Sequence, residues 1–219
     1  MDSTVTFDQT LMRGSDYAVK HKHAESFSAS PQREAFPIDR GFLGLLIFLG
    51  TEVMFFAGLI SAFLILRAGS VAWPPPNQPR LPLFVTGLNT LVLLASAFTM
   101  YRAVQALRGS TTKAHTTAWL TTTLALGLLF LAVQGVEWVR LVQFGLTFNS
   151  SIYGGTFYTL IGAHALHVLA AVIALAFVVV RARRGYYSSE NSRGLVLCRL
   201  YWFFVVGVWP ALYVLVYLN

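Results

Sequence analysis

The chain has the composition of a membrane protein. Of its 219 residues, 56% are hydrophobic and only 11% are charged, whereas ordinary soluble domains are about 25% charged. The net charge of +7 suits anionic lipid headgroups, and nothing in the sequence calls for a nucleic-acid partner. A single cysteine, Cys198, excludes an internal disulfide framework and a cysteine-based zinc or iron–sulfur site.

Residues 1–40 form a polar tail without any apolar run. The tail holds six of the nine acidic residues and five of the sixteen Lys and Arg residues. It lacks the basic start, the short apolar stretch and the small-residue cleavage site of a secretory signal. We therefore expect the first apolar span to act as an uncleaved anchor. The distribution of basic residues described below predicts that the tail lies in the cytoplasm.

Residues 41–219 are expected to form an all-α, polytopic membrane bundle with five transmembrane helices. Each apolar run has the roughly 20 residues that a helix needs to cross a bilayer. Between the first two runs, residues 72–82 carry five of the eight prolines, so no helix passes through them. Residues 144–155 form a second break, rich in Gly, Ser and Asn. The expected spans are 41–66, 82–101, 116–139, 155–180 and 195–218.

The distribution of basic residues predicts the orientation. The tail and the second and fourth loops together hold thirteen of the sixteen Lys and Arg residues, and the other side holds Arg67, Arg80 and Arg140. This positive-inside bias places the N-terminus in the cytoplasm and, after five crossings, the C-terminus outside.

The acidic and histidine side chains within the expected spans are Glu52, Glu137, His164 and His167. An ionised, unpaired Glu52 at mid-membrane would cost at least a few kcal/mol, so it is kept neutral, paired or used. His164 and His167 lie three residues apart and share one helix face. We expect Glu137 to lie at a similar depth, where it could share a hydrogen bond with these histidines.

Three interpretations of the group Glu137, His164 and His167 remain open. The first is a metal site, because two histidines and a carboxylate are a known ligand set, although a di-iron bundle would need about four carboxylates and two histidines, which the chain lacks. A proton relay is a second interpretation, because ionisable groups inside a membrane are functional candidates. The third, which we favour, is a polar network that fixes helix packing. Glu52 is open to a structural role, to proton handling or to a contact with a partner subunit.

Six sequence motifs, in order, closely resemble subunit III of haem-copper terminal oxidases. The first span contains the carboxylate, the third ends in Glu-Trp, and the fourth carries the His-x-x-His pair. The motifs are GTEVMFFAGLISAF (50–63), WPP (73–75), LNTLVLLAS (88–96), QGVEW (134–138), YGGTFYTLIGAHALHV (153–168) and YWFFVVGVWPALYVLVY (201–217). The chain resembles the short, five-helix bacterial form of that family.

The resemblance implies an accessory subunit without a catalytic centre, in a complex that reduces oxygen to water and translocates protons. Haem and copper are expected in partner subunits, and none in this chain. The expected partners are catalytic subunit I, the other oxidase subunits and structural phospholipids, with a respiratory supercomplex as a further candidate. The expected location is the bacterial inner (plasma) membrane, and the electron donor, cytochrome c or quinol, is left open.

The resemblance also assigns roles to individual residues. Glu52 matches a membrane-embedded carboxylate that reacts with hydrophobic carbodiimides, which implies a protonatable group in an apolar setting. Arg181 matches a basic position that binds phospholipid headgroups, and the subunit as a whole is expected to support proton uptake. The last span departs from the family, because Phe203 and Val206 stand where His and Asp are common. No role is carried over for that helix. The forty-residue tail has no counterpart that we could align.

Two alternative functions use the same residues. One is a freestanding proton-coupled transporter that would use Glu52 and the group Glu137, His164 and His167. The missing internal repeat and the few polar residues along the spans count against it. The other is an accessory subunit of a nitric oxide reductase, which shares the family fold.

Overall fold

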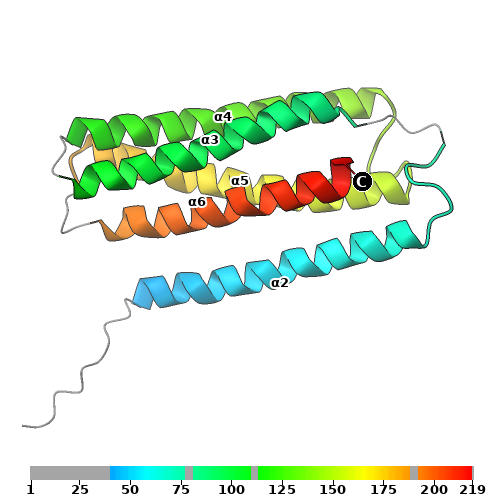
Figure 1. Ribbon diagram of the computed structural model, residues 1–219, viewed down its shortest axis with the longest axis horizontal. Coiled ribbons are helices and arrows are strands. Elements are labelled where there is room, and N and C mark those ends of the chain that lie inside the picture. The colour runs from blue at the N-terminus through cyan, green and yellow to red at the C-terminus, as the bar shows by residue number, and fades with distance from the viewer. Residues whose placement is uncertain (1–39, 77–80, 110–112, 188–191, 219) are drawn as a thin grey trace, which may run out of the picture. The chain divides into compact units, whose positions relative to one another are not determined.

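The structure is a computed structural model, and it describes residues 40–76, 81–109, 113–187 and 192–218. Within these residues the fold is all-helical, and five helices are long and apolar enough to span a membrane, which confirms the expected fold class (Figure 1). Residues 1–39 of the polar tail lie outside the described residues. The elements are α2 (Arg40–Ala68), α3 (Leu83–Arg108), α4 (Lys113–Gln143), α5 (Ile152–Arg183), α6 (Arg193–Leu212) and a short π-helix, η2 (Tyr213–Leu218).

The helices extend past the expected spans because local stop signals, rather than the edge of the hydrocarbon, end them. Helix α3 continues to Arg108, seven residues beyond its expected end. After α4, Gly145 adopts a left-handed φ of 87° and the Leu146 amide donates to the Leu141 carbonyl. This arrangement is a Schellman cap, in which glycine pays no steric penalty. The Ser151 hydroxyl then accepts a hydrogen bond from the Gly154 amide and caps the start of α5.

Helix α2 packs less tightly than the other four helices. It contacts α5 and α6 (Figure 1), and only 6% of its most apolar stretch is buried in the chain, against 28–39% for the others. Its buried side chains, Leu49, Phe56 and Phe63, recur every seven residues. This heptad spacing keeps one narrow face of α2 against its neighbours. The position of α2 therefore depends on a few contacts along this face.

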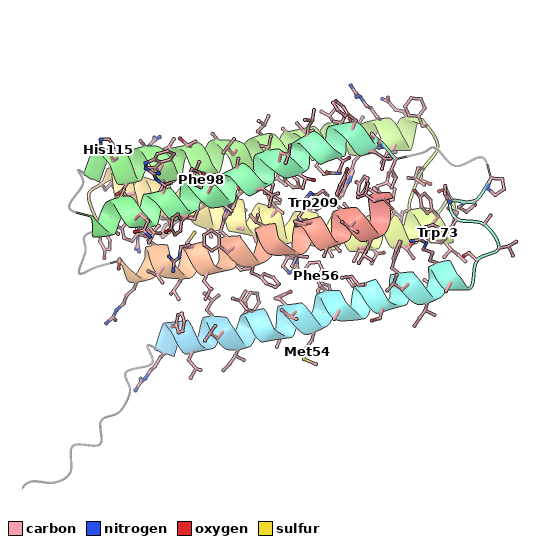
Figure 2. All side chains as sticks on the ribbon, viewed as in Figure 1. Met54, Phe56, Trp73, Phe98, His115 and Trp209 are labelled. Carbon is pink, nitrogen blue, oxygen red and sulfur yellow. The ribbon has the colours of Figure 1, made fainter. Side chains whose placement is uncertain are left out.

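Aromatic contacts hold α2 near both of its ends. The ring of Phe48 lies 6.1 Å from that of Tyr201 in α6. At the other end, Trp73 in the loop after α2 packs edge-on against both Phe63 and Tyr153, with ring centroids 5.6 and 5.1 Å away. Figure 2 shows Trp73 at this end of the bundle.

A polar seam, which was not predicted from the sequence, joins α3 to α4 and α6 and also joins α4 to η2. The Trp209 indole donates to the Thr90 hydroxyl at 2.8 Å, and the Trp202 indole donates to the Ser96 hydroxyl at 3.2 Å. Further bonds of the seam are Thr99 to Thr123, the Asn89 amide to the Phe130 carbonyl, and the Gln134 amide to the Tyr217 hydroxyl. Because lipid tails cannot satisfy these groups, the seam fixes which helix faces meet.

We expect Thr90→Val to destabilise the bundle by about 1–3 kcal/mol, because it keeps the side-chain shape but leaves the buried Trp209 N–H without an acceptor. Thermal unfolding in detergent measures the effect. Thr122→Val is the matched control, since the exposed Thr122 hydroxyl bonds to the Ala118 carbonyl of its own helix. Equal melting temperatures for the two variants would show that the seam does not stabilise the bundle.

Candidate functional site

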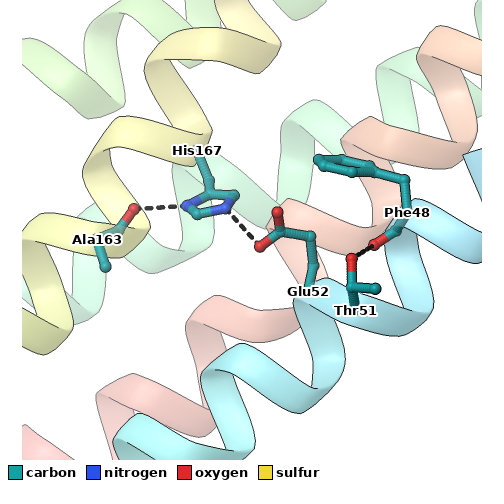
Figure 3. Close-up of polar contacts among 5 residues, drawn as sticks. All are labelled: Phe48, Thr51, Glu52, Ala163 and His167. Carbon is teal, nitrogen blue, oxygen red and sulfur yellow. Dashed lines mark hydrogen bonds and ion pairs between the residues drawn. The ribbon is translucent and has the colours of Figure 1, made fainter.

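The most distinctive site in the described residues is a contact between Glu52 of α2 and His167 of α5. Glu52 follows Leu49 by three residues and precedes Phe56 by four, so it lies on the packed face of α2. Its Oε2 lies 2.8 Å from His167 Nε2 (Figure 3). The carboxylate is therefore paired, which is one of the three states that its position inside a span allows.

The other ring nitrogen of His167 fixes the proton count of this pair. His167 Nδ1 lies 2.7 Å from the Ala163 carbonyl oxygen, and because a carbonyl can only accept, Nδ1 carries a hydrogen. One further proton then lies between Nε2 and Oε2. The pair is either neutral imidazole with a carboxylic acid or imidazolium with a carboxylate. Both states have zero net charge, which a membrane interior tolerates far better than a lone ion.

Aromatic rings surround the pair without enclosing it. Phe56 packs edge-on against His167, with ring centroids 5.0 Å apart, and Phe55 lies 6.1 Å away. The side chains of His167 and Glu52 are 17% and 16% exposed. The pair is thus screened by apolar groups while a partner molecule or a small apolar reagent can still reach it.

His164 lies on the same face of α5 but has a different environment. It is 1% exposed and stacks on Trp209 of α6, with ring centroids 5.0 Å apart. Phe56 covers it edge-on at 6.2 Å, and Figure 2 shows Phe56 and Trp209 in the interior between the helices. Neither ring nitrogen of His164 has a hydrogen-bond partner among the described residues. Its contacts are those of a flat packing group.

We expect His164→Phe to keep or raise the thermal stability of the bundle, because the ring stack survives and a buried polar group without a partner disappears. His164→Ala should instead cost about 2–4 kcal/mol, since it leaves a cavity beside Trp209. Thermal unfolding of the two variants in detergent separates these cases. A strongly destabilised Phe variant would show that the imidazole nitrogens themselves are needed.

The expected hydrogen bond between Glu137 and a histidine is not formed. Glu137 is 5% exposed, and its Oε1 accepts from Arg140 at 3.1 Å, one turn along α4. The expectation that Glu137 lies at a depth similar to that of the histidines was wrong. Glu137 lies six residues, or about 9 Å, before the end of α4, whereas His164 lies twelve residues, or about 18 Å, into α5. The group is therefore divided, because His167 pairs with Glu52 and Glu137 pairs with Arg140.

Arg181 lies in the last turn of α5, where its guanidinium group stacks over two aromatic rings. The guanidinium carbon lies 4.7 Å from the ring centroid of Phe177 and 4.9 Å from that of Tyr186. In the loop that follows, burial raises the pKa of the Tyr187 hydroxyl, while the nearby Arg181 charge lowers it. These contacts hold the guanidinium in a defined position at the end of the helix.

The described residues contain no group of three or more His, Cys, Asp or Glu side chains placed to hold a metal ion. In α6, Val206 is buried in the core and Phe203 packs against it. The two positions where the family commonly has His and Asp are therefore apolar packing positions here.

Five membrane-spanning helices with a Glu–His pair of zero net charge define a polytopic membrane protein with a protonatable site between two of its helices. A profile of the family described as cytochrome c oxidase subunit III matches residues 24–219. The chain belongs to this family. The match begins within the tail, so residues 24–40 do have a counterpart, contrary to the sequence analysis.

Named relatives agree with the family match. Cytochrome c oxidase subunit 3 of Synechocystis sp. is 38% identical over 181 residues, which are 82% of this chain and 76% of the relative. The protein of the same name from Thermostichus vulcanus is 31% identical over 94% of both chains. Probable cytochrome c oxidase subunit 3 of Mycobacterium leprae is 36% identical over 80% of this chain and 86% of the relative. These relatives are accessory subunits of a haem-copper oxidase, so the transporter and nitric oxide reductase alternatives are not favoured.

Proposed function

We propose that this chain is the cofactor-free accessory subunit of a haem-copper oxidase in a bacterial inner membrane, where it flanks catalytic subunit I. The observation that carries the proposal is the family match across residues 24–219, on a fold with five membrane-spanning helices. Haem and copper would lie in partner subunits. The reaction of the complex would be oxidation of cytochrome c and reduction of oxygen to water, as the names of the relatives suggest.

The helix directions support the proposed orientation. The starts of α2, α4 and α6 and the ends of α3 and α5 share one end of the bundle (Figure 1). This is the end that carries Arg181, Arg183 and Arg184, where α5 ends. By the positive-inside rule, it would face the cytoplasm.

The Glu52–His167 pair suggests how the subunit supports the catalytic subunit. The pair holds one proton between two groups and has zero net charge. It can therefore take up or release a proton only when a neighbouring group or a water chain compensates the change in charge. It would act as a protonatable contact on the flank of subunit I, and phospholipids would fill the remaining surface between the subunits. Arg181 would serve as a headgroup contact at the cytoplasmic boundary.

Gentle purification tests the proposal. A tagged chain extracted in mild detergent from its native membranes should bring down haem-copper subunits in stoichiometric amounts. A reduced-minus-oxidised haem spectrum, subunit masses and oxygen uptake with reduced cytochrome c measure this. A chain that purifies alone and colourless, under conditions that keep a known oxidase intact, would contradict the accessory role.

A further inference from the structure

Helix α6 is the second neighbour of α2 beside the Glu52 site. On α2, Phe48 and Phe56 lie four residues before and four residues after Glu52. The Phe48 ring lies 6.1 Å from the Tyr201 ring of α6. One turn of α2 beyond Glu52, the Phe56 ring lies 6.4 Å from the Phe204 ring. The two helices begin at the same end of the bundle (Figure 1), so this register places Glu52 between Tyr201 and Phe204.

A free hydrogen-bond donor and a free acceptor lie between α2 and α6. The Tyr201 hydroxyl makes no hydrogen bond to any residue that the structure describes. Glu52 contacts His167 through Oε2, and its Oε1 likewise has no partner in the described part of the chain. Neither oxygen is fully enclosed, so a water molecule can touch each of them. A bridging water connects groups that lie beyond direct hydrogen-bond reach.

Tyr201 is also placed to feel the charge of Glu52. An electrostatic interaction links the Glu52 carboxylate to the Tyr201 hydroxyl. Among the described residues, the titratable side chains that face Glu52 from the neighbouring helices are His167 of α5 and Tyr201 of α6. His164 stacks on a ring of α6, and the Arg199 guanidinium group lies over a ring of its own helix. Tyr201 is therefore the neutral donor that remains for the second carboxylate oxygen.

We propose that Tyr201 is a positioning residue for the Glu52–His167 pair, in which its hydroxyl donates to Glu52 Oε1, directly or through one water, and favours the carboxylate form. The shared proton then moves from Oε2 to His167 Nε2, while Tyr201 keeps its own proton and the pair keeps zero net charge. Without this donor the proton returns to the carboxyl group. The inference deepens the proton-handling part of the proposed function and rests on it.

Labelling of Glu52 by a hydrophobic carbodiimide tests the assignment, because the reagent adds to a protonated carboxyl group and not to a carboxylate. Native membranes that contain the whole complex are treated with dicyclohexylcarbodiimide at alkaline pH, where little protonated carboxyl remains. The mass of the peptide that contains Glu52 gives the labelling rate. Tyr201→Phe should raise this rate about tenfold, as expected for the loss of one hydrogen bond to a charged group. Glu52→Gln should take up no label in that peptide.

Two controls separate proton binding from access of the reagent. Tyr213→Phe, in the short helix η2 that continues α6, removes a hydroxyl that donates to the Leu83 carbonyl at 3.0 Å. Its Glu52 labelling rate should stay at that of the wild type. The smaller diisopropylcarbodiimide should give the same ratio of rates between Tyr201→Phe and the wild type, because the share of protonated carboxyl does not depend on the reagent.

Three results would overturn the proposal. A Tyr201→Phe variant that is labelled at the wild-type rate would show that the hydroxyl does not stabilise the carboxylate. An equal rise in Tyr213→Phe would indicate a general loosening of the helices, and a rise that differs severalfold between the two reagents would indicate altered access. The label is read on this chain whichever partners remain. A complex that lacks haem-copper subunits would therefore count against the proposed function and not against the role of Tyr201.

Discussion

Glu52→Leu should loosen α2 from α5 and destabilise the subunit by about 1–3 kcal/mol, because it leaves His167 Nε2 without a partner inside the membrane. Glu52→Gln should cost much less, since a glutamine amide can donate to the same nitrogen while Nδ1 keeps its bond to the Ala163 carbonyl. Thermal unfolding of the complex and retention of the chain during purification measure both effects. Helix α2 is the most sensitive place for this change, because so little of it is buried.

The glutamine variant separates packing from proton handling. Glutamine preserves one hydrogen bond but cannot exchange a proton, so the complex should assemble normally and lose activity faster during sustained oxygen uptake. The control is His167→Phe, which removes both the bond and the proton site and should weaken both assembly and durability. A Glu52→Gln complex with the wild-type rate of inactivation would contradict the proton-handling role. If Glu52→Leu melts like the glutamine variant, the bond does not anchor α2.

The five spans could be predicted from the sequence because the thickness of a bilayer sets a length that hydropathy can measure. Glu52 also stood out, since a carboxylate within 26 apolar residues requires a partner or a proton. Its partner could not be predicted. Pairing depends on the depth and rotation of each helix. Glu137, the carboxylate expected beside the histidines, differs from His164 in depth by six residues, about 9 Å. Local stop signals such as Gly145 set where each helix ends. They thereby affect which residues of neighbouring helices lie at the same depth.

The polar seam had a sequence signal that was overlooked. Thr86, Asn89, Thr90, Ser96 and Thr99 follow helical spacing within one apolar span, and they lie on one buried face of α3. Polar residues that recur at three and four positions inside a membrane helix indicate a helix contact. The sequence could thus have shown which face of α3 is buried. It could not show that two tryptophans of α6 supply the donors.

The second large effect is expected at Gly127, which faces Trp202 of α6 and Val172 of α5. A Cβ at this position would lie 2.6 Å from Cη2 of Trp202 and 3.2 Å from Cγ2 of Val172. Trp202 is 1% exposed, and its indole N–H is bonded to Ser96, so it cannot move without weakening the seam. We expect Gly127→Ala to destabilise the bundle by about 1–3 kcal/mol, the usual cost of overpacking.

Gly135→Ala is the matched control, because it lies in the same helix and an added Cβ would meet nothing within 4 Å. It should leave stability unchanged or raise it by up to about 1 kcal/mol, since alanine favours a helix more than glycine does. Thermal unfolding of both variants in detergent gives the comparison. Adding Trp202→Phe to Gly127→Ala should recover part of the loss, because the smaller ring removes the contacting atom. If Gly127→Ala melts like Gly135→Ala, the approach of Trp202 to α4 does not limit the packing, and glycine is not required there.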